Sequence, residues 1–137
     1  MNTCTKKITT IIFALLIVVT MSVSLIVYAY ETPAFHIYLS SGIESTTTGT
    51  TTGLWKGFEC NNFTTSSQNA RADVFANNGS GYRIDRTIIV APGDSSGAEV
   101  TNTYSTPCLW YLKLSASHYI FQRPDVDAEA YLWLVQN

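Results

Sequence analysis

Three carboxylates alternate near the C-terminal end of the chain, at Asp125, Asp127 and Glu129. If this stretch is extended, all three side chains point to one side, because side chains alternate between the two faces of a strand. Carboxylate oxygens gathered in this way suit Ca²⁺. The spacing differs from that of an EF-hand loop, whose sixth position is glycine, where this chain has Ala130. A calcium site is therefore one candidate, and a solvated loop partly neutralised by Arg123 is the alternative.

Hydrolytic chemistry is a second candidate, because His118 lies close in sequence to Asp125 and Asp127 and serines are plentiful. No spacing among these residues fixes which would act as nucleophile and which as base. His36 and His118 lie far apart, and no His-Glu-x-x-His zinc motif is present. The sequence therefore predicts no catalytic residue, cofactor or resident metal, and a small secreted hydrolase is only the third functional hypothesis.

Aromatic residues near the C-terminal end form a candidate binding face. In extended segments, Tyr111, Tyr131 and Trp133 point away from a set of apolar neighbours. If those neighbours form the core, the three aromatic side chains make an outer surface suited to sugar rings or apolar partners. The alternative is that a second layer, for example residues 35–39, covers this face. The apolar neighbours that are expected to point into the core are Trp110, Leu112, Leu132 and Leu134.

Two of the three cysteines, Cys60 and Cys108, remain if the leader with Cys4 is removed. A disulfide between them is expected if the chain is exported, because exported domains commonly oxidise an even number of cysteines. Closing a loop of about 49 residues would stabilise the fold by about 4 kcal/mol in the simple loop model. Two buried free thiols are the alternative. No spacing supports a metal or redox motif built on these cysteines.

Residues 1–29 have the pattern of a signal peptide. Lys6 and Lys7 precede an apolar run over residues 11–27, and Val27 and Ala29 suit the −3 and −1 positions of a cleavage site. The mature chain would begin at or near Tyr30. An uncleaved N-terminal anchor is the alternative, since about 17 apolar residues approach the length that spans a bilayer.

The charge of the mature chain limits its partners. Without Lys6 and Lys7, six of the eight Lys and Arg residues remain against all ten acids, a net charge of −4. Nucleic acid is therefore excluded as an expected partner, because its phosphates require a clustered basic surface. Membrane contact is expected only through the leader, if it is not cleaved.

The mature chain predicts an all-β fold, a small antiparallel β-sandwich of about seven strands, because apolar residues alternate with a period of two between turn residues. The predicted domains are the signal peptide at 1–29, an N-terminal segment with a Thr/Gly-rich linker at 30–53, and the sandwich at 54–137. The expected strands are 31–39, 54–60, 70–76, 82–90, 98–104, 108–114 and 128–135, with a short one at 118–121.

The register of one hairpin can also be predicted. If the turn centres on Asn78, Arg71 faces Asp85 and Asp73 faces Arg83, which gives two oppositely charged pairs on one face. A one-residue slip would place charges opposite apolar side chains, so the pattern favours the centred register.

The five residues 53–57, Gly-Leu-Trp-Lys-Gly, resemble the Gly-x-Trp-x-x-Gly-like opening of lactococcin-type bacteriocins, with the spacing one residue short. The bacteriocin domains are much shorter and lack a cysteine pair. The main functional hypothesis is a secreted, non-enzymatic protein that binds a surface glycan or protein partner. A secreted antimicrobial or toxin-like factor is the alternative.

Overall fold

The computed structural model describes residues 33–117 and 122–133. The expected signal peptide at 1–29, the short strand at 118–121 with His118, and Leu134 therefore lie outside the described residues. The chain divides into two compact units after Glu31, and the described residues belong to the second. In the described part of the chain, no helix has the length and apolar character needed to cross a membrane.

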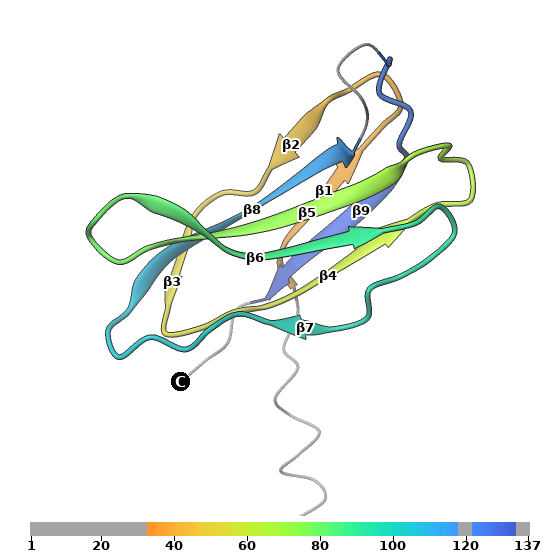
Figure 1. The fold of residues 1–137 in the computed structure, drawn as a ribbon. Helices are drawn as coiled ribbons and strands as arrows, with labels where there is room; N and C mark the ends of the chain where they lie inside the picture. The colour runs from red at the N-terminus through yellow and green to blue at the C-terminus, as the bar shows by residue number, and fades with distance from the viewer. Residues whose placement is uncertain (1–32, 118–121, 134–137) are drawn as a thin grey trace, which may run out of the picture. The chain divides into compact units, whose positions relative to one another are not determined.

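The described residues form nine strands and two antiparallel sheets (Figure 1). One is a four-stranded sheet in the order β1-β9-β4-β7. The other is a five-stranded sheet in the order β2-β8-β5-β6, in which β3 also pairs with β8. The all-β antiparallel fold is thus confirmed. The strands are β1 (Pro33–Leu39), β2 (Ser45–Thr47), β3 (Thr51–Gly53), β4 (Gly57–Asn62), β5 (Asn69–Asn77), β6 (Tyr82–Val90), β7 (Glu99–Val100), β8 (Cys108–Ser117) and β9 (Ala128–Trp133).

The Thr/Gly-rich stretch before residue 54 is not a linker, because it contributes β2 and β3 to the five-stranded sheet. Between these two strands, the backbone N–H of Thr48 donates to the carbonyl of Leu112 over 2.9 Å. The Thr48 hydroxyl in turn accepts a hydrogen bond from the Leu112 N–H, also over 2.9 Å. Threonine fits this position because its hydroxyl can accept the hydrogen bond of the Leu112 N–H.

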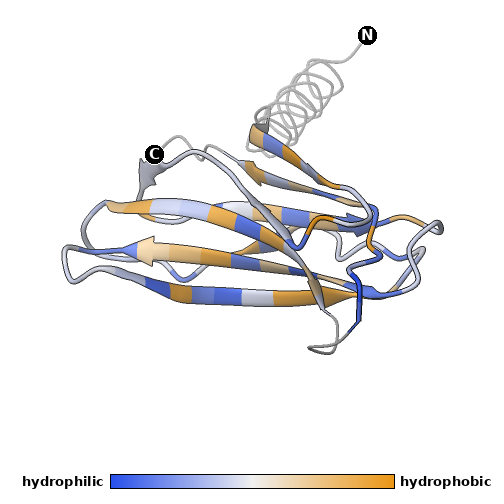
Figure 2. Cartoon of the chain, turned by 90° about the horizontal axis from the view of Figure 1, so that it is seen from above, coloured by the Kyte–Doolittle hydropathy of each residue, from blue (hydrophilic) through white to orange (hydrophobic). Residues whose placement is uncertain are grey.

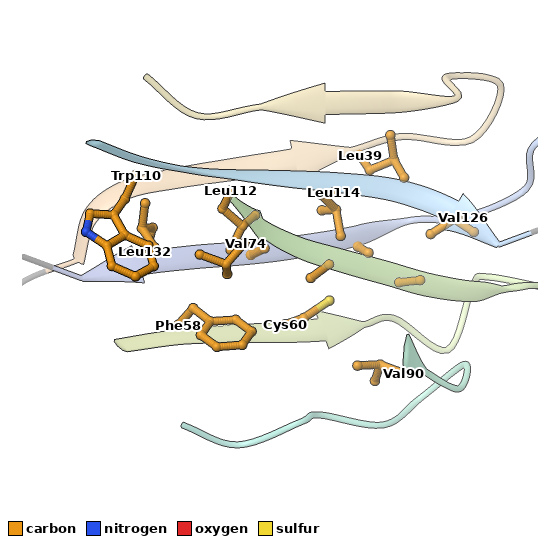
Figure 3. Packing of buried hydrophobic residues seen from close by; sticks show 14 of the residues in the cluster. Leu39, Phe58, Cys60, Val74, Val90, Trp110, Leu112, Leu114, Val126 and Leu132 are labelled. Carbon is orange, nitrogen blue, oxygen red and sulfur yellow. The ribbon is translucent and has the colours of Figure 1, made fainter. Parts of the chain in front are cut away.

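Period-two alternation is confirmed in the strands that form the core (Figure 2). On β8, Trp110, Leu112 and Leu114 are fully buried, whereas Tyr111 and Lys113 between them are half-buried. The buried side chains of both sheets belong to one cluster (Figure 3). Each strand of this core therefore presents one face to the cluster and the other to the outside. The inward residues of β5 are Ala70, Ala72, Val74 and Ala76.

The predicted register of the β5–β6 hairpin is wrong. Asn77 pairs with Tyr82 and Phe75 with Ile84, so the turn spans residues 78–81. The Asn77 side-chain oxygen accepts hydrogen bonds from the backbone N–H groups of Gly79 and Gly81, and both glycines have a positive φ. This side-chain cap stabilises a four-residue turn that the charge pattern does not reveal.

The longer turn already separates the predicted charge pairs, and a bulge at Asp85 shifts the register by one more residue. Val74 pairs with Arg86 and Phe75 with Ile84, which leaves Asp85 without a partner residue across the ladder. Its carboxylate instead accepts hydrogen bonds from the N–H of Asn102 over 2.9 Å and from the hydroxyl of Tyr104 over 2.9 Å. Asp85 therefore connects β6 to the segment after β7.

The predicted disulfide is not present, since Cys60 and Cys108 are both buried free cysteines. Cys60 lies in β4 of the four-stranded sheet, opposite Ala130, whereas Cys108 begins β8 in the five-stranded sheet, opposite Gly53. Figure 3 shows Cys60 near the middle of the core and Trp110, two residues after Cys108, towards one end. The even number of cysteines predicted a pair, but it contains no information on where the strands place them.

Both thiols are expected to be unreactive in the native protein at neutral pH. Burial, followed by the charges of Glu59 and Glu129, raises the pKa of Cys60 to about 12. Burial also raises the pKa of Cys108, so neither forms much of the reactive thiolate. Reaction with a thiol reagent, followed by mass spectrometry, should label both cysteines in urea without reductant and neither in buffer. A Cys60–Cys108 cross-linked peptide in a non-reducing digest would contradict the structure.

Candidate functional site

The three aromatic residues predicted to share a face lie on two different sheets. Tyr111 is on the outer face of β8 in the five-stranded sheet, where it stacks on Phe75 with ring centroids 4.6 Å apart. Tyr131 and Trp133 are on the outer face of β9 in the four-stranded sheet. The prediction put all three side chains on one outer surface, but β8 and β9 join different sheets, so Tyr111 is not part of a common surface with the other two.

Tyr131 belongs instead to a continuous row of rings that crosses from β9 to β1. His36 stacks on Tyr131, with ring centroids 4.2 Å apart and ring planes 10° from parallel. The ring of Tyr38 is tilted against that of His36, with ring centroids 4.3 Å apart. Tyr38 is 59% exposed, so the row ends in solvent. The aromatic residues of β1 could have been found in the sequence, because His36 and Tyr38 alternate with the apolar residues of the same strand.

The ring of Trp133 lies against the backbone of β4. Gly57 is the partner of Trp133 across the ladder, and a Cβ atom at residue 57 would lie 2.6 Å from Cε3 of the indole. Real Cβ atoms do not approach another atom so closely, so glycine at this position allows the ring to lie over the strand. We define the aromatic face as the outer-face residues His36, Tyr38, Tyr131 and Trp133.

A polar row on β4 and β9 borders the aromatic face. Glu129 accepts hydrogen bonds from Asn61 Nδ2 over 3.2 Å and from His36 Nε2 over 2.9 Å, and a further one from the Tyr131 side chain. Burial raises the pKa of Glu129, but these three hydrogen bonds outweigh it and hold the pKa below its ordinary value. Burial, followed by the hydrogen bond to Glu129, raises the pKa of Tyr131 to about 12.

Glu59 is the less constrained carboxylate of this row. It faces Tyr131 across the β4–β9 ladder and is half-buried. Within the described part of the chain, its one hydrogen-bond partner is the Ser95 hydroxyl, at 3.3 Å. Glu59 therefore retains acceptor capacity for a ligand, whereas the oxygens of Glu129 are already engaged.

A shallow hollow of about 340 Å³ continues from the polar row. It begins at Asn61 and Glu129 and is bounded by Asp94 and Ser95 of the loop between β6 and β7. The hollow extends the surface on which a ligand bound at the aromatic face could make hydrogen bonds.

The candidate calcium site is not formed by the predicted residues. Asp125 accepts hydrogen bonds from the hydroxyls of Ser67 and Ser41, and Asp127 accepts one from the Ser41 N–H over 3.0 Å. These hydrogen bonds, with that from Ser67 the stronger, lower the pKa of Asp125. Glu129 belongs to the separate network around His36, and among the described residues no group of three potential ligands could hold a metal ion. Asp125 and Asp127 instead fasten neighbouring loops.

Charge is distributed unevenly between the strands of the two sheets. The described strands of the four-stranded sheet contain three glutamates and neither lysine nor arginine, with His36 as their one basic residue. The strands of the five-stranded sheet contain four basic residues and two aspartates. The acids of the first sheet are Glu59, Glu99 and Glu129, and the charged residues of the second are Arg71, Asp73, Arg83, Asp85, Arg86 and Lys113.

In comparisons with known proteins, no family model, no curated protein and no solved structure matched the chain. The functional argument therefore depends on the geometry of the chain's own residues.

Proposed function

We propose that this protein is an exported β-sandwich that binds glycans at a cell surface or in the medium through the aromatic face, without catalysing a reaction. The single observation on which the proposal rests is the row of rings on the outer face of β1 and β9, beside hydrogen-bonding side chains of β4. Export rests on the signal-peptide pattern of residues 1–29.

The chemistry of the face suits a sugar ring. A pyranose presents C–H groups on its flat sides and hydroxyl groups around its edge. The indole over Gly57 offers flat apolar surface for the C–H groups, and the stacked rings of His36 and Tyr131 lie beside it on the same face. Asn61 and Glu59 lie beside this surface and can hydrogen-bond the hydroxyl groups. Because the rings lie on paired strands, their positions are fixed before a ligand binds.

Replacing Trp133 by alanine should weaken glycan binding about tenfold, because one stacking surface is lost, an effect of about 1.4 kcal/mol. The measurement is binding to a glycan array and to isolated cell-wall polysaccharides, followed by affinity determination for the best ligand. Tyr111→Ala is the matched control, since it removes an aromatic side chain from the outer face of the other sheet.

Tyr38→Ala separates loss of binding from loss of folding. Tyr38 is 59% exposed, so its removal should leave the thermal unfolding temperature nearly unchanged while reducing affinity. Retained affinity in both Trp133→Ala and Tyr38→Ala, or an equal loss in Tyr111→Ala, would contradict the proposed face. Absence of any glycan ligand from the screen would contradict the proposed function itself.

A further inference from the structure

We infer that the glycan bound by the aromatic face contains hexosamine units with a free amine, and that Glu59 accepts the ammonium group of one unit. This inference rests on the proposed function and specifies the ligand class of the same site.

The position of Glu59 supports this assignment. Glu59 is directly opposite Tyr131 in the β4–β9 ladder and two residues from Gly57, over which the Trp133 indole lies. A sugar stacked on these rings would therefore have its edge beside the Glu59 carboxylate. That carboxylate has one hydrogen bond of 3.3 Å to Ser95, whereas Glu129 is engaged by Asn61, His36 and Tyr131.

The charge of the sheet favours a cationic group over a neutral or anionic one. The described strands around the aromatic face contain no lysine or arginine, and His36 already bonds Glu129. A stacked sugar would displace water from Glu59, and an ammonium group replaces that water with a charge-assisted hydrogen bond. A uronic acid or sulfated sugar would place a second negative charge beside Glu59, which is unfavourable.

A sugar amine fits this geometry better than a lysine-rich peptide. The indole of Trp133 lies over the strand at Gly57, and its flat surface suits the side of a pyranose. The amine of a hexosamine is attached directly to that ring, so stacking and the contact with Glu59 occur together. A lysine ammonium lies at the end of a flexible chain and would lose side-chain entropy on binding.

The test is isothermal titration calorimetry of the purified protein at pH 6 with two probes, a glucosamine hexamer and the N-acetylglucosamine hexamer of the same length. We expect the free-amine hexamer to bind at least tenfold more tightly, with the difference decreasing at high salt. Glu59→Gln should remove this preference, because the affinity for the free-amine hexamer falls to that for the acetylated hexamer. Glu99→Gln is the matched control, because Glu99 pairs with the inward-facing Phe58 and lies on the other side of the same sheet.

Each other outcome overturns the inference in a distinguishable way. Equal affinity for the two hexamers, unaffected by Glu59→Gln, would overturn the amine assignment while leaving glycan binding intact. Binding of a lysine oligopeptide that depends on Glu59 and exceeds that of the glucosamine hexamer would assign the face to a basic protein segment instead. If neither hexamer binds and no other glycan does, the proposed function fails together with the inference.

Discussion

Replacing Trp110 by alanine is expected to lower the free energy of unfolding by about 3–5 kcal/mol. The Trp110 side chain is fully buried, and its Nε1 donates to the carbonyl of Gly53 over 2.7 Å. Its ring also packs edge to face against the ring of Tyr104, with ring centroids 5.6 Å apart. The substitution leaves a cavity in the core and removes the hydrogen bond that links β8 to the end of β3. Urea unfolding followed by circular dichroism measures the loss.

Leu109→Ala is the control for Trp110→Ala. Leu109 precedes Trp110 on β8 but is 43% exposed, because it points to the opposite face. Its replacement should change the free energy of unfolding by no more than about 0.5 kcal/mol. Similar losses in the two variants would show that β8 does not alternate as described.

Lys56→Met is expected to raise the free energy of unfolding by about 1–3 kcal/mol at pH 7. Lys56 is fully buried, and its ammonium group donates to the carbonyl of Thr52 over 2.9 Å. In the described part of the chain, no carboxylate forms an ion pair with it. Methionine has a similar length and no charge to desolvate, so it should fill the same space at lower cost.

The stabilising effect of Lys56→Met should decrease as the pH rises towards 10.5. Burial lowers the pKa of Lys56 in the folded protein below its ordinary value of 10.5. Between the two pKa values the unfolded chain binds more protons than the folded one, so the stability of the unsubstituted protein rises with pH in that window. Urea unfolding of both proteins at pH 7 and pH 10 measures this. A stability difference that does not change with pH would show that Lys56 titrates normally.

Local features of the chain could be predicted from the sequence. Six of the seven main expected strands were found, because alternation such as that of Ala70, Ala72, Val74 and Ala76 depends only on neighbouring residues. The strand expected at 98–104 is reduced to the two residues of β7, and β2 and β3 were not expected. Trp110, Leu112 and Leu132 were correctly placed in the core for the same reason. Leu134, the fourth of that set, lies outside the described residues.

Long-range relations between strands could not be predicted in this way. Tyr111 and Tyr131 both point outwards, as expected, but nothing in the spacing of β8 and β9 indicates that they join different sheets. The positions of Cys60 and Cys108 depend on the same information. The hairpin register was missed because Asn77 caps a longer turn and Asp85 forms a bulge, and both features depend on side-chain hydrogen bonds that the residue pattern does not show.

The candidate site was predicted in part. Tyr131 and Trp133 share one outer face, but His36 and Tyr38 were not included, because residues 35–39 were considered only as a possible cover for that face. The structure shows that β1 pairs with β9 on the side away from β4 and adds the rings of His36 and Tyr38 to the surface. The residues that make up the aromatic face therefore depend on which strands are neighbours in the sheet.

The bulge at Asp85 affects how this protein can aggregate. β6 is the last strand of its sheet in the part of the chain that the structure describes, and its Tyr82, Ile84 and Ile89 are 41%, 49% and 56% exposed. A regular strand with such side chains at a sheet edge is a template on which a second chain can add by backbone pairing. The additional residue interrupts the regular spacing of donors and acceptors along that edge, and charged Arg86 follows it immediately. The irregularity therefore protects a β-rich chain against growth into fibrils at this edge.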